Sequence, residues 1–183
     1  MNLNVNHILE SSKVQGPGTR FTVWVQGCSI HCEQCSNKDT WDFSSDKKKF
    51  GTNYSIEDLT HHILESKSTG LTITGGEPLD QFHSTLELCK QVFKHKDIFL
   101  CSGYKYDTIK KSSMKEILET IDIICAGPFD YKQKCQSQWK GSSNQEVIYL
   151  TERGKNLLDL PILKKEYRIN KKTGEMIVTG FSI

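Results

Sequence analysis

The sequence lacks long hydrophobic stretches and a strong excess of charge of one sign. No apolar run approaches the roughly 20 residues that span a bilayer, and the opening residues, MNLNVNHILE, lack the basic start and apolar core of a signal peptide. The 24 Lys and Arg residues nearly balance the 22 Asp and Glu residues, which leaves a formal net charge of +2. Such a small charge does not indicate nucleic acid or membrane as a partner. We therefore expect a cytoplasmic protein that binds neither.

A fourth cysteine is also missing beside the first three. The chain has seven cysteines, an odd number that fits poorly with paired disulfides, which are rare in the cytoplasm. Cys28, Cys32 and Cys35 lie in a C-x3-C-x2-C pattern with no other cysteine nearby. Because structural metal sites usually close with four ligands, the pattern raises the question of what fills the fourth position.

The length of 183 residues predicts one domain over residues 1–183. Five runs rich in branched and aromatic residues have the composition of strands, and the first four run into glycine. The near-continuous hydrophobicity of these first four runs indicates strands buried on both faces of a parallel sheet. The runs begin at Phe21, Leu71, Asp97, Ile121 and Glu146.

Helical patterns lie between these runs. Ser55 and Asp58 form a capping box that predicts a helix start. A second helix is expected from Asp80, a plausible N-cap, and a less regular third one over residues 107–120. Strand–helix–strand units connect with a right-handed crossover, which makes the strands parallel.

Chain length restricts the kind of barrel that these units can form. Eight βα units need about 200–250 residues, more than this chain offers. We therefore expect an α/β fold, an open partial (βα) barrel of five to six parallel strands, with a core over residues 21–150 and a C-terminal hairpin over residues 165–183. Chemistry collects at the C-terminal ends of such strands, and the cysteine pattern follows the first of them.

Three thiolates on one short loop suit an iron–sulfur cluster. A cubane 4Fe-4S cluster needs one outside ligand at each iron, so three cysteines leave the fourth iron open to a small molecule. The alternative is zinc bound by the three cysteines and a histidine. His31 is the local candidate, but it precedes Cys32 directly, and the two side chains can hardly reach one ion.

The C-x3-C-x2-C loop after the first strand, together with GGEP (residues 75–78) after the second, resembles the radical S-adenosylmethionine superfamily. Further blocks in order resemble one family within it, the activating proteins of anaerobic ribonucleoside-triphosphate reductase. These blocks are GPGTR (16–20), CSNKDTW (35–41), GYK (103–105), GPF (127–129) and GSSNQ (141–145). Two positions depart from the pattern: Gln34 stands where an aromatic residue is frequent, and Ala126 where an acidic residue often precedes GPF.

The resemblance implies a radical activase. A reduced 4Fe-4S cluster would cleave S-adenosylmethionine to a 5′-deoxyadenosyl radical, which generates a glycyl radical on anaerobic ribonucleoside-triphosphate reductase. It also implies a low-potential electron donor such as flavodoxin. Two alternatives stay open: a radical enzyme acting on another glycyl radical enzyme or on a small-molecule, nucleotide or peptide substrate, and a non-enzymatic electron carrier or zinc module.

The same resemblance assigns the site residues, with no catalytic side chain beyond the cluster and the cofactor. The metal ligands are Cys28, Cys32 and Cys35. Residues 75–78 would hold the methionine end of the cofactor, residues beside the last cysteine its adenine, and Ser102 its ribose. The full set of cofactor contacts is Gln34, Cys35, Ser36, Gly75, Gly76, Glu77, Pro78 and Ser102.

Other residues that bear chemistry have simpler explanations. Cys89, Cys101 and Cys125 lie in apolar stretches and are expected to be buried structural thiols. Cys135, in a polar stretch, is either a reactive thiol or a ligand at a second site. Arg20 faces a carboxylate of the cofactor or partner, or a structural acid of the protein itself.

Overall fold

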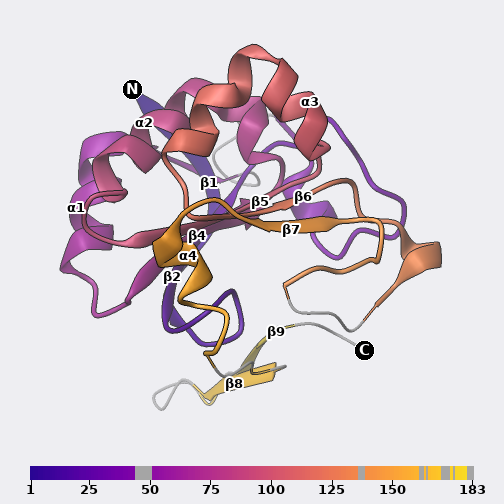
Figure 1. Ribbon diagram of the computed structural model, residues 1–183. Helices are drawn as coiled ribbons and strands as arrows, with labels where there is room; N and C mark the ends of the chain where they lie inside the picture. The colour runs from indigo at the N-terminus through magenta and orange to yellow at the C-terminus, as the bar shows by residue number, and fades with distance from the viewer. Residues whose placement is uncertain are drawn as a thin grey trace.

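The computed structural model describes residues 1–43, 51–135, 139–160, 163, 165–169, 174 and 176–180. A seven-stranded sheet with the order β3-β1-β2-β4-β5-β6-β7 forms its centre, and α1, α2 and α3 lie on one face of it (Figure 1). The strands are β1 (Asn2–Ser12), β2 (Arg20–Val25), β3 (Thr52–Ser55), β4 (Gly70–Gly75), β5 (Asp97–Ser102), β6 (Ile123–Ala126) and β7 (Glu146–Tyr149). The α-helices are α1 (Ile56–Glu65), α2 (Phe82–Val92), α3 (Tyr106–Lys111) and α4 (Glu152–Lys155).

The sheet is mixed, so the prediction of five to six parallel strands is wrong. Within the described ranges, β2, β4, β5 and β6 pair in parallel, while β1, β3 and β7 pair antiparallel to their neighbours. The reason lies in the connections. A parallel neighbour needs a crossover segment of a dozen or more residues, usually a helix. β1 reaches β2 by the short segment 13–19, and β6 reaches β7 without an α-helix in the described part of 127–145.

The helices follow their sequence signals unevenly. Ser55 is the N-cap of α1, as predicted, and its Oγ accepts a hydrogen bond from the Asp58 N–H at 3.0 Å. Asp80 is not the N-cap of α2: that position is Gln81, and Asp80 lies in the 3-10 turn η2 (Pro78–Gln81). The third helix breaks at Ser112 into α3 and the 3-10 segment η3 (Ser113–Glu119). None of the described helices combines the length and apolar composition needed to cross a bilayer.

Alternate residues of β5 and β6 face two separate apolar clusters, which confirms the predicted burial of these two strands on both faces. The edge strand β7 contacts both clusters with half-buried residues. One cluster lies under α1 to α3, and the other lies on the opposite face with Trp139 and Leu157. The strand residues toward the helices are Ile98, Leu100, Ile124, Ala126 and Ile148. Those on the opposite face are Phe99, Cys101, Ile123, Cys125, Val147 and Tyr149.

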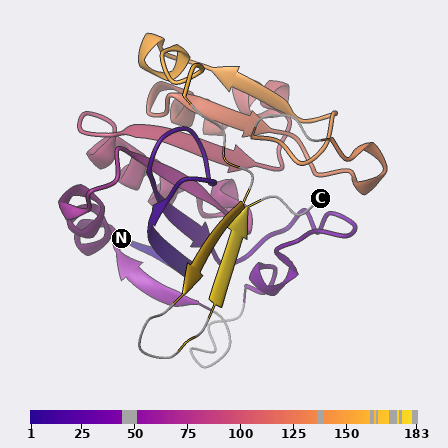
Figure 2. The same cartoon turned by 90° about the horizontal axis from the view of Figure 1, so that it is seen from below.

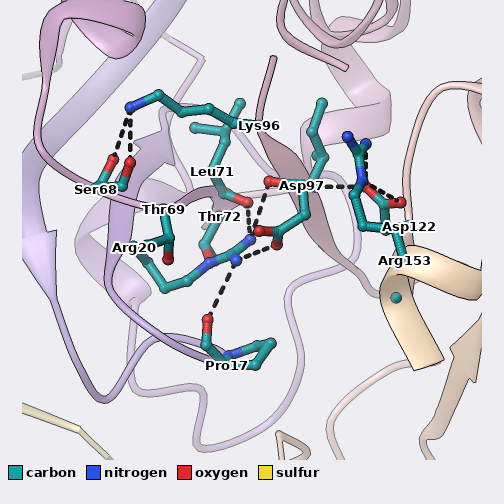
Figure 3. Close-up of polar contacts among 12 residues, drawn as sticks. Pro17, Arg20, Ser68, Thr69, Leu71, Thr72, Lys96, Asp97, Asp122 and Arg153 are labelled. Atoms are coloured by element: carbon teal, nitrogen blue, oxygen red, sulfur yellow. Dashed lines mark hydrogen bonds and ion pairs between the residues drawn. The ribbon is translucent and has the colours of Figure 1, made fainter. Parts of the chain in front are cut away.

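A buried ion pair joins the N-terminal ends of the parallel strands (Figure 3). The guanidinium of Arg20 contacts the carboxylate of Asp97 and the carbonyl of Leu71, and it donates to Pro17 O at 3.2 Å and Thr72 Oγ1 at 3.0 Å. Its side chain is 0% exposed. A buried charge is tolerable only when it is paired and hydrogen-bonded, and Arg20 meets both conditions. The structural acid is thus the partner of Arg20.

Two further polar groups hold the same edge. The buried Asp122 carboxylate accepts from the Ile98 N–H at 2.9 Å and from Arg153, which reaches over from α4. Lys96 donates through Nζ to the carbonyls of Ser66 and Ser68, at 2.9 and 2.8 Å. Figure 3 shows these groups beside the Arg20–Asp97 pair. The loops at this end of the sheet are therefore fixed by charge-assisted hydrogen bonds, which are stronger than neutral ones.

The C-terminal strands β8 (Lys165–Ile169) and β9 (Met176–Gly180) pair antiparallel in a separate two-stranded sheet, as the sequence predicts. Residues 170–173, 175 and 181–183 of the expected hairpin lie outside the described residues. Figure 2 shows this pair of strands on the side of the large sheet away from α1 to α3. Glu166 ties it to the end of β1 by accepting from Ser12 Oγ at 3.1 Å. The division into a core over 21–150 and a hairpin over 165–183 stays a prediction.

We expect Asp97→Asn to lower the free energy of unfolding by about 3–5 kcal/mol, because it leaves the buried Arg20 charge without a counter-charge. Urea unfolding followed by circular dichroism measures this change. Lys90→Ala, which removes the exposed Lys90–Glu116 ion pair, is the control and should leave the midpoint unchanged. A wild-type midpoint for Asp97→Asn would show that the buried pair does not stabilise the fold.

Candidate functional site

The cysteine loop, residues 28–41, begins where β2 ends and is closed by its own backbone. Gly27 N–H donates to Thr40 O at 2.7 Å, and Cys28 N–H donates to Trp41 O at 3.1 Å. The loop therefore leaves the sheet and returns to the same place at the C-terminal end of β2. This is the edge of the sheet where the sequence predicts the chemistry.

All three cysteines of the loop are free thiols. Cys28 is buried, while Cys32 and Cys35 are half-buried, and burial raises the pKa of both Cys28 and Cys32. The residues just before Cys32 and Cys35 adopt the left-handed conformation, with φ of 51° at His31 and 55° at Gln34. Non-glycine residues in this region cost free energy and concentrate at functional sites. The backbone here therefore turns sharply twice, once before Cys32 and once before Cys35.

His31 is used for packing. Its ring stacks on Trp41 with 4.6 Å between ring centroids and 19° between the planes, which does not favour the zinc alternative that needs His31 as fourth ligand. Across the part of the chain that the structure describes, no group of three His, Cys, Asp or Glu side chains is arranged to hold a single metal ion. A cubane cluster binds each thiolate at a different iron, so its cysteines need not converge on one point.

The GGEP turn that follows β4 lies directly against the start of the cysteine loop. Gly75 has a φ of +101°, a conformation that favours glycine. A Cβ at Gly76 would lie 2.1 Å from the carbonyl oxygen of Gly27. That carbonyl accepts a hydrogen bond from the Glu77 N–H at 2.8 Å. The two glycines therefore let one backbone contact another, a reason independent of any ligand.

The carboxylate of Glu77 is buried beneath this turn and is fully used within the protein. It accepts from the Leu79 N–H at 2.9 Å, from Ser102 Oγ at 2.8 Å and from the Gly103 N–H at 2.7 Å. Burial raises the pKa of Glu77 to about 7, although these hydrogen bonds oppose the shift. Glu77 thereby joins the loop after β4 to the loop after β5.

The eight predicted cofactor contacts differ in exposure. Gln34 and Ser36 are exposed on the cysteine loop, free to meet a ligand, and Cys35, Gly75 and Gly76 are half-buried. Glu77 and Ser102 are buried and bind each other, and Pro78 is also buried. The structure thus brings the residues after β2, β4 and β5 together at one edge, while ligand contact by any of them stays a prediction.

Sequence reasoning missed a second carboxylate at this edge, Asp80. It accepts from the Ser29 N–H at 2.6 Å, from Ser29 Oγ at 2.9 Å and from the Tyr104 hydroxyl at 2.9 Å. The signal was present in the sequence, because Asp80 follows GGEP at a strand end. We interpreted it as a helix cap, a role that aspartate often has.

The blocks GPF and GSSNQ form the other side of the site. Gln145 Oε1 accepts from the Gly141 N–H at 2.8 Å, and its Nε2 donates to Gly127 O at 2.9 Å. Asn144 donates to Pro128 O at 2.8 Å. GSSNQ therefore holds the GPF loop in place. Burial raises the pKa of the Cys32 thiol, and the nearby Phe129 N–H opposes that shift.

A cleft of about 660 Å³ opens beside Phe129. Glu33 of the cysteine loop and Tyr131 both line it, and burial together with the nearby Glu33 carboxylate raises the pKa of Tyr131. The remaining lining residues are Lys105, Gly127, Pro128, Phe129, Asp130, Lys132, Gln133, Asn144 and Glu146. Its volume lies within the range of roughly 300–1,000 Å³ that is usual for ligand sites.

Of the three cysteines predicted to be buried structural thiols, Cys89 and Cys125 are buried, whereas Cys101 is half-buried. Cys89 is fully buried in α2, and burial raises its pKa above the ordinary range. Cys101 and Cys125 pair in register on β5 and β6, and burial raises the pKa of Cys125 to about 12. Cys135 is a free, half-buried thiol, and neither a reactive nor a ligand role is tested for it.

Comparison with known proteins gives one matching family model, named relatives and one solved structure. A family model described as a 4Fe-4S single cluster domain matches residues 14–148. The anaerobic ribonucleoside-triphosphate reductase-activating protein of Enterobacteria phage T4 is 33% identical over 150 residues, which cover 79% of this chain and 93% of that protein. The protein of the same name from Escherichia coli K12 is 34% identical over 145 residues, covering 75% and 92%. The crystal structure of QueE from Escherichia coli is 23% identical with a TM-score of 0.48, covering 56% and 53%.

The raised pKa of Glu77 predicts a pH-dependent stability. The folded state holds this proton up to about pH 7, while the unfolded chain releases it near the ordinary value of 4.5. The contribution of Glu77 is therefore fully present below that value and is lost as the pH rises through about 7, a change of about 3 kcal/mol. Glu77→Gln does not titrate, so the free energy of unfolding of the wild type relative to this variant should fall between about pH 5 and 7.5. If urea unfolding gave a constant difference in free energy between the wild type and Glu77→Gln over this pH range, the prediction would be wrong.

Gly76→Ala should destabilise the protein by about 1–3 kcal/mol, because the new methyl group meets the rigid backbone of Gly27. Gly103→Ala is a matched comparison at the same edge. Its Cβ would meet the end of the Ile30 side chain at 2.5 Å, which can turn away, so we expect a smaller loss. Thermal unfolding of both variants measures the difference, and equal losses would refute the close-backbone argument.

Proposed function

Since this chain belongs to the 4Fe-4S single cluster domain family and to the family of anaerobic ribonucleoside-triphosphate reductase-activating proteins, we propose that it is the radical S-adenosylmethionine activase of such a reductase. The observation that carries the proposal is the meeting of two motifs. The cysteine loop and the GGEP turn, 47 residues apart from Cys28 to Gly75 in the sequence, contact each other through Gly27 and Glu77.

Cys28, Cys32 and Cys35 would hold three irons of a 4Fe-4S cluster. The donor set fits, because the three thiols are free and follow one another on a loop bent at His31 and Gln34. Soft thiolates are the ligands that iron–sulfur clusters prefer. When bound and reduced, the cluster supplies the electron that cleaves S-adenosylmethionine and so produces the radical that removes a hydrogen atom from a glycine of the partner.

The chain's own residues would bind and orient the cofactor. Gln34 and Ser36, whose side chains are exposed, would contact its adenine. Residues 75–78 would hold its methionine end through the backbone, since the Glu77 carboxylate is already occupied. Ser102 would lie near the ribose, and because its hydroxyl already donates to Glu77, it would act by holding Glu77 in place. Cys35, between Gln34 and Ser36 in the sequence, would contribute as a cluster ligand. No general base is needed for transfer of a hydrogen atom.

The partner's glycine must reach the same loop. We place its path at the cleft beside Phe129 and Glu33, where a segment of a large partner could approach Cys32. The finer features belong to the same proposal: curvature of the sheet into an open partial barrel, a low-potential donor such as flavodoxin, and a cytoplasmic location that keeps the thiols reduced.

The proposal predicts that the protein, reconstituted anaerobically with iron and sulfide and then reduced, converts S-adenosylmethionine to 5′-deoxyadenosine. Chromatography of the quenched reaction measures the product. Cys32→Ala is the control and should lose the activity, because it removes one of three cluster ligands. Adding the reductase should then produce a glycyl radical that electron paramagnetic resonance detects.

The outcomes separate the alternatives. Product without a glycyl radical on the reductase would favour another glycyl radical enzyme or a small-molecule, nucleotide or peptide substrate. A loaded cluster that yields no 5′-deoxyadenosine, with and without the reductase, would favour an electron carrier and refute the activase.

A further inference from the structure

Asp80 connects three segments at the site edge of the sheet. It lies in η2, after β4, and both of its carboxylate oxygens are used by other loops. Oδ2 accepts from the Ser29 N–H, and Oδ1 accepts from Ser29 Oγ and from the Tyr104 hydroxyl. Ser29 belongs to the cysteine loop and Tyr104 to the loop after β5. None of these bonds caps a helix, since the N-cap of η2 is Glu77 and that of α2 is Gln81.

These contacts bracket one of the three cysteines. On the N-terminal side of Cys28, the Gly27 carbonyl is held by the Glu77 N–H at 2.8 Å. On its C-terminal side, the Ser29 N–H is held by Asp80 at 2.6 Å. Both neighbours of Cys28 are thus fixed by residues of one short turn. A charge-assisted bond from a backbone N–H to a carboxylate is roughly twice as strong as a neutral one.

The other two cysteines are held differently. Cys35 N–H donates to Cys32 O at 3.1 Å, a bond within the loop itself. The Asn37 N–H donates to Cys35 Sγ at 3.4 Å, again within the loop. The described contacts of Asp80 therefore act on the Cys28 end of the loop alone.

We propose that Asp80 is a positioning residue for Cys28: its carboxylate fixes Ser29, and through Ser29 it holds Cys28 where the cluster requires a ligand. This inference rests on the proposed cluster site. Partners that orient metal ligands without touching the metal are worth about 10–100-fold in metal affinity. Asp80 would belong to that class, with the difference that it acts through the backbone of the next residue.

Two substitutions separate the geometry from the charge. Asp80→Ala removes all three acceptor contacts. Asp80→Asn is close in shape, keeps one oxygen for the Ser29 N–H, and can donate its amide N–H to the hydroxyls of Ser29 or Tyr104. The asparagine variant should thus keep most of the positioning while losing the charge. Asp159→Ala, at an exposed position in the turn after α4, is the matched control.

The first measurement is hydrogen–deuterium exchange of the metal-free protein. In Asp80→Ala the Ser29 amide should exchange about 10-fold faster, as expected for loss of a hydrogen bond to a charged group. The increase should be confined to the cysteine loop. Asp80→Asn should change the exchange less than Asp80→Ala, and Asp159→Ala should match the wild type.

The second measurement is release of iron from the reconstituted proteins to a chelator. Asp80→Ala should release iron about 10-fold faster than the wild type, with Asp80→Asn in between and Asp159→Ala unchanged. Wild-type exchange at Ser29 in Asp80→Ala would overturn the inference, and so would faster exchange spread evenly over α2 and β4. A wild-type protein that takes up no iron would refute the proposed function instead, while exchange in the metal-free protein still decides the role of Asp80.

Discussion

The close approach of Gly76 to Gly27 is the constraint on which the site depends. β2 and β4 are parallel neighbours in a register that pairs Val25 with Gly75, so the residues that follow both strands emerge side by side. At this point the two backbones are near enough that a side chain on Gly76 would overlap the Gly27 carbonyl. The first cysteine follows Gly27 directly. Its position is therefore set by the strand register and by the absence of one Cβ.

The opposite edge of the sheet maintains that register. Arg20 begins β2, Asp97 begins β5, and the carbonyl of Leu71 lies between them in β4, so one guanidinium spans three strands. Gly70, which pairs with Arg20 in the register, leaves room for the guanidinium, because a Cβ there would lie 2.0 Å from Arg20 Nη1. Buried charge holds one end of the strands, while thiols and exposed polar groups occupy the other. The residues that stabilise the sheet and the residues of the candidate site therefore lie at opposite ends of the same strands.

Local patterns in the sequence predicted five strands of the large sheet but missed β1 and β3, and they predicted the arrangement of the elements only in part. The apolar runs identified β2, β4, β5 and β6, and the capping box identified the start of α1, because these signals depend on neighbouring residues. The predicted parallel direction of β7 is wrong. The direction of this strand depends on the connection after β6, and the composition of β7 itself does not reveal that connection. Asp80 was misread for a related reason: its partners, Ser29 and Tyr104, lie 51 and 24 residues away. The sequence located the edge of the site, but long-range contacts decide which side chains are free there.

Those contacts change how the motif residues are understood. A glutamate and a serine at the ends of adjacent strands suggest ligand contact, yet Glu77 and Ser102 bind each other below the surface. The Gln145 side chain is likewise used within the protein, because it donates to the Gly127 carbonyl and so holds the GPF loop. Because three thiolates are the only side chains that a cluster open at one iron requires from the protein, the remaining polar residues of the motifs are free to serve the loops. The positions of Glu77, Ser102 and Gln145 are thus explained by the loops that these residues hold.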